Sequence, residues 1–302
     1  MAPSTHSHSA DSRNDDILID INGEHVQRAQ ATVSVFDSGF ILGDGVWEGL
    51  RVANGCIAFL DLHLERLYAG AKALDFHPGP SAAELTARLY RLLEANGMRD
   101  GVHIRLMVTR GVKSTPYQDP RVTVTPPTIV IVPEYKEPRP TTVEQGIRLF
   151  TTHVRRGYPD VQDAGLNSHS KLNCILACIQ AAKAGVDEAL MLDPHGFVAT
   201  CNSTHFFIVT RGEVWTSSGD YCLGGITRGV VLELARADGY VCRERNFRLL
   251  DVYSADEAFV TGTFAGVVPV TEVDGRHISD GRGETVERLQ TLYAGRLAEE
   301  CR

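Results

Sequence analysis

Two adjacent glycines that lead directly into a helix are the feature that most constrains this chain. Gly224 and Gly225 allow a sharp backbone turn, and the run from Val230 to Arg236 then repeats apolar residues at helical spacing until Gly239 ends it. Such a loop presents unpaired backbone N–H groups and the positive end of the helix dipole. The sequence therefore predicts a place that can accept an anion such as phosphate, although most Gly-Gly turns before helices bind nothing.

The composition is that of an ordinary globular protein, with 43 % hydrophobic and 23 % charged residues among 302. This length suits one large or two medium domains. The net charge of −8 and the lack of a basic cluster argue against a nucleic-acid partner, and no apolar run reaches transmembrane length. Residues 1–16 are polar and lack the core of a signal peptide.

The seven cysteines are odd in number and scattered along the chain. They predict neither a disulfide framework nor a metal site. Cys174 and Cys178 lie one helical turn apart on an apolar segment and are interpreted as buried thiols. A reducing, cytoplasmic environment fits this pattern.

The order of periodic segments predicts two α+β units of mostly antiparallel strands. We expect a disordered tail at 1–15, a small N-terminal domain at 16–133, a proline-rich linker at 134–146 and a larger domain at 147–302. Helices are expected at about 61–75, 81–97, 171–184, 230–236 and 282–299. Strands are expected at about 17–21, 101–109, 127–133, 147–152, 188–192, 206–210, 213–216, 257–261 and 267–273. Asn22-Gly23 and Asn54-Gly55 predict tight turns, and Ser81 with Glu84 predicts a capping box.

Several blocks of sequence go beyond these generic patterns. One runs Ser34-Val35-Phe36-Asp37-Ser38-Gly39-Phe40, continues as Gly43-Asp44-Gly45-Val46-Trp47-Glu48-Gly49-Leu50-Arg51, and is followed by His63-Leu64-Glu65-Arg66-Leu67. Together with 187–193, 224–228 and 259–263, it resembles the class IV, fold type IV pyridoxal-phosphate aminotransferases, which include branched-chain and D-amino-acid aminotransferases. The resemblance covers residues 17–275 in order. It implies a two-domain fold type IV enzyme with a small N-terminal and a larger cofactor-binding domain.

The resemblance implies pyridoxal 5′-phosphate as the cofactor and assigns residues to its phosphate. Arg66 matches the arginine that grips the phosphate, and a planar guanidinium suits that group. Ile226 and Thr227 match the backbone N–H donors at the helix start, and Gly262 and Thr263 match a second phosphate loop. Taken without the family, Arg66 is a surface helix arginine and Gly262 a turn after a strand.

Three further residues are candidates for the substrate side. Trp47 falls where the family has an aromatic residue that lines the active site, and Arg105 falls where branched-chain enzymes carry a site arginine. Trp47 could equally be a core residue, and Arg105 a strand residue that faces solvent. Lys113 lies on a loop that could face a substrate carboxylate.

The family holds its cofactor as a Schiff base on a lysine just before the helix expected at 171–184. Lys171 resembles that lysine by its surroundings. Counting back from Gly185 and Glu188, however, puts the family's lysine at about 165–167, and anchoring on Leu172-Asn173 puts it at Ser170. A helix shorter by one turn would reconcile these counts, and a surface lysine at the helix start remains the alternative.

Thr200 stands where the family has a glutamate that pairs with the pyridine nitrogen. A threonine offers only a neutral hydrogen bond, so the ring should be a weaker electron sink. The function implied is an aminotransferase that acts on an amino donor and a 2-keto acid, as a homodimer like its relatives. A lyase or racemase on the same fold, and a cofactor-binding pseudoenzyme without turnover, stay open as alternatives.

Overall fold

The computed structural model describes residues 5, 6 and 8–302, and the chain divides into two compact units. Unit 1 comprises the described residues up to His8 together with Pro138–Gly165 and Leu172–Glu299. Unit 2 comprises Ser9–Glu137, Leu166–Lys171 and Glu300–Arg302. The segment Leu166–Lys171 therefore belongs to the N-terminal unit, although the sequence predicted it inside the larger C-terminal domain.

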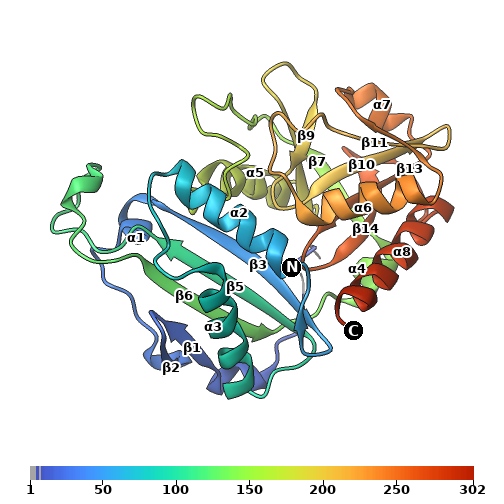
Figure 1. The fold of residues 1–302 in the computed structure, drawn as a ribbon. Helices are drawn as coiled ribbons and strands as arrows, with labels where there is room; N and C mark the ends of the chain where they lie inside the picture. The colour runs from blue at the N-terminus through green and yellow to red at the C-terminus, as the bar shows by residue number, and fades with distance from the viewer. Residues whose placement is uncertain (1–4, 7) are drawn as a thin grey trace. The chain divides into compact units, whose positions relative to one another are not determined.

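Unit 2 is built on a six-stranded sheet in the order β2-β1-β6-β5-β3-β4, in which every neighbouring pair is antiparallel (Figure 1). Its strands are β1 (Leu18–Ile21), β2 (Glu24–Gln27), β3 (Gly45–Ala53), β4 (Cys56–Ile57), β5 (Val102–Thr109) and β6 (Thr128–Tyr135). Its helices are α1 (Ser38–Leu42), α2 (Leu60–Ala73) and α3 (Ala82–Ala95), with 3-10 turns η1 (Ser12–Asp16), η2 (Arg28–Gln30) and η3 (Pro120–Val122).

The two faces of this sheet differ because successive side chains of a strand point to opposite sides. Along β3, Val46, Leu50 and Val52 are buried and pack with leucines of α2 and α3 in one core. The alternate residues of β3, among them Trp47 and Arg51, are only half-buried. One face of the sheet is therefore the hydrophobic core of unit 2, and the other face remains available for polar and aromatic side chains.

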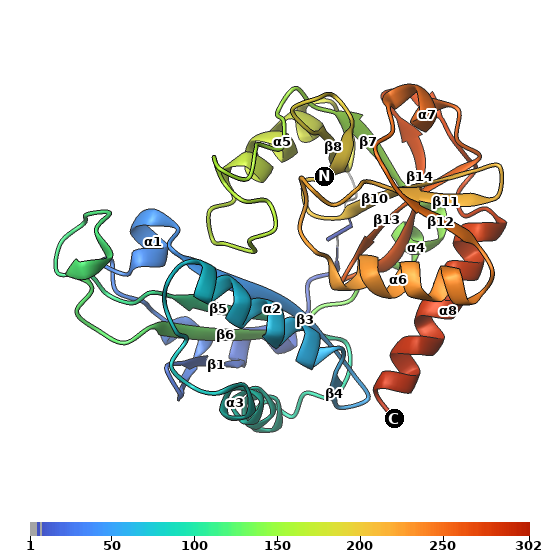
Figure 2. The ribbon, with the colours of Figure 1, turned by 45° about the horizontal axis from the view of Figure 1, so that its top comes forward.

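Unit 1 is built on a nine-stranded mixed sheet in the order β12-β11-β10-β13-β14-β7-β8-β9, with β15 paired to β14. Its strands are β7 (Ile147–Thr151), β8 (Glu188–Leu192), β9 (Val198–Cys201), β10 (His205–Thr210), β11 (Glu213–Thr216), β12 (Val241–Glu244), β13 (Glu257–Gly262), β14 (Gly266–Val273) and β15 (Arg276–His277). Its helices are α4 (Pro140–Gln145), α5 (Leu172–Lys183), α6 (Ile226–Ala237), α7 (Leu249–Tyr253) and α8 (Glu284–Glu300), which Figure 2 shows from a second direction.

The locally encoded expectations are confirmed. Asn22 and Gly23, and Asn54 and Gly55, all have positive φ, as tight Asn-Gly turns require. The capping box of Ser81 and Glu84 is formed at the start of α3. Strands β2, β9, β12 and β15 and the short helices α1, α4 and α7 were not predicted, because each is too short to establish a clear periodicity.

Two predicted irregular segments contain ordered structure. The segment predicted as a linker contains α4, which begins at Pro140, a residue whose fixed φ suits the first turn of a helix. In the segment predicted as a tail, η1 forms and Thr5 is buried. Residues 1–4 and 7 of that segment lie outside the described residues.

The cysteine pattern also needs a correction. Cys56, in β4, and Cys301, after α8, form a disulfide within unit 2. Cys178 is exposed and Cys174 is half-buried, so the two are not buried thiols as the sequence suggested. The pairing joins residues separated by 245 positions, which spacing alone could not indicate.

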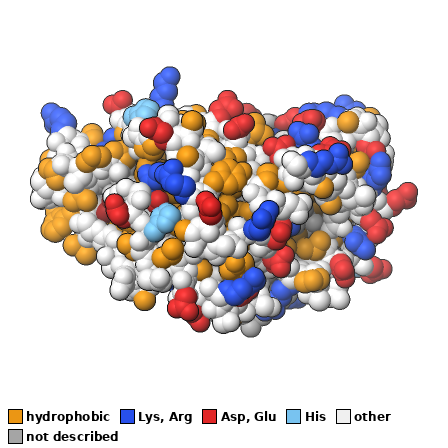
Figure 3. All heavy atoms as spheres, turned by 60° about the horizontal axis from the view of Figure 1, so that its bottom comes forward, with side chains coloured by type: hydrophobic (Ala, Val, Ile, Leu, Met, Phe, Trp, Pro, Cys, Tyr) orange, Lys and Arg blue, Asp and Glu red, His pale blue; other side chains and the backbone are white. Residues whose placement is uncertain are grey.

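The surface carries both signs of charge. On the face drawn in Figure 3, Lys and Arg side chains alternate with Asp and Glu side chains and with hydrophobic groups. Among the residues that the structure describes, no helix has the length and apolar character needed to cross a membrane. No group of three or more His, Cys, Asp or Glu side chains in this part of the chain is arranged to hold a metal ion.

Candidate active site

The segment Leu166–Lys171 is bound to the edge of β3. The amide of Trp47 donates to the carbonyl of Asn167 at 3.0 Å, and the amide of His169 donates to the carbonyl of Gly45 at 3.0 Å. Val46 and Ser168 form an antiparallel bridge between these two bonds. This edge pairing explains why the segment belongs to unit 2, and it fixes the backbone immediately before Lys171.

Side-chain contacts strengthen the same junction. The Trp47 indole N–H donates to the carbonyl of Ser168 at 3.0 Å, and the His169 Nε2 lies 3.1 Å from the carbonyl of Val46. Burial lowers the pKa of His169, and although its bond to Val46 works against this effect, the charges of Arg105 and Lys171 add to it. A neutral His169 would carry its proton on Nε2, where it donates to Val46.

Three residues predicted from the sequence meet on the open face of the unit 2 sheet. The guanidinium carbon of Arg105 lies 3.8 Å from the centre of the Trp47 ring, a cation–π contact. The Nζ of Lys171 lies 5.4 Å from the centre of the same ring. Trp47 therefore brings Lys171 and Arg105 to one surface, and a half-buried indole with two cations is suited to an anionic ligand.

Arg66 has a different environment, on the face of β3 that α2 covers. Its Nε donates to Glu48 Oε1 at 2.8 Å, and its Nη2 donates to Glu48 Oε2 at 2.6 Å. His63 Nδ1 lies 2.7 Å from the same Oε2. Burial alone would raise the pKa of Glu48, but the hydrogen bonds from Arg66 and His63 outweigh burial and hold it below its ordinary value. Glu48 thus fixes the direction of the Arg66 guanidinium.

In unit 1 the two predicted phosphate loops lie side by side. Gly225 is the N-cap of α6 and forms no side-chain cap, so the first-turn N–H groups of α6 have no partner from that residue. A Cβ at Gly225 would lie 2.3 Å from His205 Nε2, so a larger residue there would require His205 to move. His205 is opposite Thr261 in the β10–β13 register, and Thr261 directly precedes the second loop at Gly262 and Thr263. One histidine therefore borders both loops.

Buried polar atoms without a partner mark the same region. Among the described residues these atoms include Thr261 Oγ1 and Arg228 Nε. Thr261 is fully buried, and Arg228 lies in the first turn of α6 just after Ile226 and Thr227. The Arg228 guanidinium is held through Nη2 by the Ser217 carbonyl and Glu244, so the unsatisfied Thr261 hydroxyl is the more relevant group. A phosphate fits a glycine-lined helix start beside a strand that ends with such a hydroxyl, so the residues of unit 1 fit the phosphate of pyridoxal 5′-phosphate.

Thr200 is connected to these loops through Thr204. The Thr200 hydroxyl donates to the carbonyl of Thr204 at 2.8 Å, and a Cβ at Gly262 would lie 3.4 Å from the methyl group of Thr204. Because its proton is used in this way, Thr200 can only accept from a ligand. That arrangement fits a protonated ring nitrogen but supplies no negative charge to it.

A buried carboxylate lies next to this threonine pair. Glu188 Oε2 accepts from the Thr204 hydroxyl at 2.7 Å, and Glu188 Oε1 accepts from the Thr5 hydroxyl. Burial raises the pKa of Glu188 to about 7, against the lowering effect of hydrogen bonds from Thr204 and Ser203.

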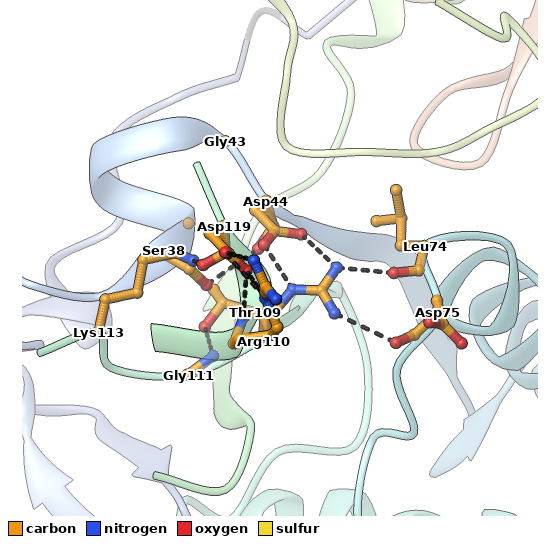
Figure 4. A network of polar contacts seen from close by, with 12 residues as sticks. Ser38, Gly43, Asp44, Leu74, Asp75, Thr109, Arg110, Gly111, Lys113 and Asp119 are labelled. Atoms are coloured by element: carbon orange, nitrogen blue, oxygen red, sulfur yellow. Dashed lines mark hydrogen bonds and ion pairs between the residues drawn. The ribbon is translucent and has the colours of Figure 1, made fainter. Parts of the chain in front are cut away.

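The sequence suggested that the loop of Lys113 could face a substrate carboxylate, but the structure gives this side chain a different environment. Its side chain is buried, and its Nζ donates to the carbonyl of Asp119 in the same loop at 3.1 Å. Figure 4 shows it beside a network in which Arg110 pairs with Asp44 at 2.7 Å. Thr109, in the same network, donates to Asp37 at 2.9 Å. The Lys113 ammonium is thus directed to its own loop.

The sequence did not single out Glu48, His63, Asn167 or His205 as site residues. Glu48 and His63 stand inside the matched blocks, so their position was a signal. The only signal for Asn167 was that counting back from Gly185 and Glu188 placed the family's lysine at 165–167. His205 gave no signal, because its importance depends on its closeness to Gly225.

Comparison with known proteins supplies the family context. A model of the family described as amino-transferase class IV matches residues 45–273. The chain is 42 % identical over 276 residues to a putative branched-chain-amino-acid aminotransferase of Methanocaldococcus jannaschii, covering 90 % of this chain and 94 % of the relative. It is 41 % identical over 278 residues to branched-chain-amino-acid aminotransferase-like protein 2 of Arabidopsis thaliana, covering 92 % of this chain.

The chain spans about half the length, 50 %, of that Arabidopsis relative. Among solved structures, the branched-chain aminotransferase of the archaeon Thermoproteus uzoniensis with norvaline is similar with a TM-score of 0.85 and 29 % identity. The match covers 94 % of this chain and 96 % of that one. The fold is therefore the two-domain, α+β fold type IV of these enzymes.

Proposed function

Because the chain belongs to the amino-transferase class IV family, we propose that it is a pyridoxal 5′-phosphate-dependent aminotransferase that moves an amino group between an amino donor and a 2-keto acid. The observation that carries the proposal is the surface shared by Lys171, Trp47 and Arg105, where a lysine amine and an arginine flank one indole. A reactive amine beside a carboxylate-binding cation is the arrangement that amino-acid chemistry requires.

The proposed cofactor contacts are those of the phosphate and of the ring nitrogen. Arg66, oriented by Glu48, and the backbone of Ile226 and Thr227 hold the phosphate, together with Gly262 and Thr263. When bound, the cofactor supplies a carbonyl that takes up an amino group and a ring that withdraws electrons from the reacting carbon. Thr200 accepts a hydrogen bond from the ring nitrogen, and its neutrality makes this ring a weaker electron sink than a carboxylate partner would.

The remaining proposed roles concern the substrate and the proton. Lys171 would hold the cofactor until the incoming amine displaces it, and as a free amine it would then move the proton between the substrate Cα and C4′ of the cofactor. Arg105 binds the substrate carboxylate and Trp47 forms a wall of the site. Lys113, which bonds to the Asp119 carbonyl, contributes only if its loop opens.

The test is transfer of label. Purified protein with pyridoxal 5′-phosphate is given ¹⁵N-labelled glutamate or a branched-chain amino acid and a panel of 2-keto acids, and products are identified by mass spectrometry. Label in a new amino acid supports the proposal. Loss of the donor without any keto-acid requirement indicates a lyase, inversion of the donor indicates a racemase, and bound cofactor without any conversion indicates a pseudoenzyme.

We also propose a homodimer, by analogy with the family. The apolar residues exposed on α5 support it, since Leu172 is 67 % and Ile175 51 % exposed in the single chain. Sedimentation equilibrium distinguishes one chain from two. We also propose a cytoplasmic location, because the cysteines are scattered and suggest no disulfide framework. The Cys56–Cys301 disulfide is the observation that opposes this location, since disulfides are rare in strongly reducing compartments.

A further inference from the structure

The amino group of Lys171 is bound by a side chain four residues earlier. Its Nζ donates to Asn167 Oδ1 at 3.1 Å. Asn167 is itself buried, with 6 % of its surface exposed, and its Nδ2 donates to the carbonyl of Trp47 at 2.6 Å. Because an amide has one donating and one accepting end, the bond to Trp47 directs the Asn167 oxygen at the lysine.

The accepting oxygen is held rigidly, whereas the lysine side chain is flexible. The Asn167 backbone is paired to Trp47 on the edge of β3, and its side chain is tied to the same residue. A rigid acceptor favours one conformation of the lysine side chain among many. Such pre-organisation reduces the entropy that a reacting group loses when it is brought into position. The amine of Lys171 is thereby directed back along the chain toward position 167.

The direction of the Lys171 side chain accounts for the different positions that counting along the sequence gave for the family's lysine. Counting from Gly185 and Glu188 places the family's lysine at 165–167, and the structure brings the Lys171 amine to the side chain of residue 167. We propose that Asn167 is a positioning residue that orients the Lys171 amine and holds it as an ammonium ion before the cofactor arrives. The Lys171 amine, oriented by Asn167, would then have the role that a single lysine has in the family. This inference rests on the proposed function.

The charge of the amine is set by its surroundings in a way that can be measured. A carbonyl oxygen that accepts from Nζ favours the ammonium form, as does the Trp47 ring face. The Arg105 guanidinium over the same ring opposes it, and this contribution is the same in the parent and in both Asn167 variants. Removing the oxygen by Asn167→Ala should make the amine react at lower pH. Replacing it by a carboxylate in Asn167→Asp should have the opposite effect, because a nearby negative charge favours the ammonium form further. A purely structural role predicts no such opposite signs.

The experiment uses the full chain without added cofactor and acetic anhydride as the probe. Acetylation of Lys171 is followed against pH by mass spectrometry, with the exposed Lys183 of α5 as an internal reference. We expect the midpoint to shift by about one pH unit to the acid side in Asn167→Ala and to the alkaline side in Asn167→Asp. Ser170→Ala is the matched control, because it removes the 3.3 Å bond from Ser170 to the Gly43 carbonyl in the same segment. It should leave the midpoint unchanged.

A second readout uses pyridoxal 5′-phosphate and borohydride. The share of Lys171 that carries a reduced pyridoxyl group is compared at a pH above all the acetylation midpoints, where the amine is neutral in every variant. There it should fall several-fold in Asn167→Ala, because the amine is no longer oriented, and stay close to the parent value in Ser170→Ala. If the parent protein carries no pyridoxyl group, the proposed function fails, but the acetylation profiles still decide the role of Asn167. Midpoints that do not move, or that move in the same direction in both Asn167 variants, would overturn the inference. If Asn167→Ala does not fold, an unmoved midpoint in Asn167→Asp alone overturns it.

Discussion

The guanidinium of Arg66 meets the carboxylate of Glu48 at two points, with Nε 2.8 Å from Oε1 and Nη2 2.6 Å from Oε2. Glu48 has no exposed surface, and it is also in contact with His63. The arginine proposed to hold the cofactor phosphate is therefore oriented by a buried acid. We therefore expect stability and cofactor binding to be coupled at this pair.

Glu48→Ala should lower the free energy of unfolding by about 3–5 kcal/mol, because it leaves a partly buried arginine without its main partner. Urea denaturation measures this difference. Glu65→Ala is the matched control, since Glu65 is an exposed carboxylate on the same helix as Arg66. Equal stability of the two variants would contradict the importance of the pair.

The same carboxylate gives a pH dependence with a definite sign. The pKa of Glu48 in the folded chain lies below the ordinary value of 4.5, so its contribution to stability is complete above that pH and is lost as the pH falls through the folded pKa. Acid titration of the parent should show a loss of stability below about pH 4.5 that is smaller in Glu48→Gln. A parallel acid limb in the two proteins would argue against it.

Arg66→Ala should weaken the binding of pyridoxal 5′-phosphate by roughly ten- to a hundred-fold, the effect of losing a charge-assisted contact of about 1.5–3 kcal/mol. Arg66→Lys keeps the charge but not the planar fork, so we expect it to recover only part of the affinity. Equilibrium dialysis gives the dissociation constants, and circular dichroism verifies folding. Lys72→Ala removes another cation from α2 and should bind as the parent does; unchanged binding in Arg66→Ala would remove this residue from the phosphate site.

The sequence predicted what is encoded by neighbours in the chain. The capping box of Ser81 and Glu84 and the turn at Asn22 depend on residues only a few positions apart. The family motifs extended this to Trp47 and Arg105, which the structure brings into contact. Local signals and motifs were therefore enough for the fold class and for one surface of the candidate site.

Contacts between distant parts of the chain could not be predicted in the same way. Asn167 pairs with Trp47 across 120 positions, and no periodicity in the sequence encodes that edge pairing. The same holds for the bond of Glu48 to Arg66, since Arg66 was expected to serve the phosphate alone. The Cys56–Cys301 disulfide, which closes an even longer loop, was missed for the same reason. The connection of Lys171 to Asn167 became visible only in the structure.

Glu188 should make the protein less stable as the pH rises from about 4.5 to about 7. Its pKa is raised from 4.5 to about 7 by burial, so between these values the folded chain binds more protons than the unfolded chain and stability falls with increasing pH. The full effect is about 3 kcal/mol by linkage. Glu188→Gln should flatten the decline in melting temperature across this pH range, and an equally steep decline in that variant would contradict a protonated, buried Glu188.

The most direct measurement identifies the lysine that carries the cofactor. The protein is loaded with pyridoxal 5′-phosphate, reduced with borohydride, digested and sequenced by mass spectrometry, with Lys171→Ala treated in parallel. We expect the pyridoxyl mass on Lys171, on the peptide that also contains Asn167, and no labelled lysine in Lys171→Ala. A pyridoxyl mass on another lysine, or bound cofactor with no modified lysine at all, would contradict the assignment of Lys171.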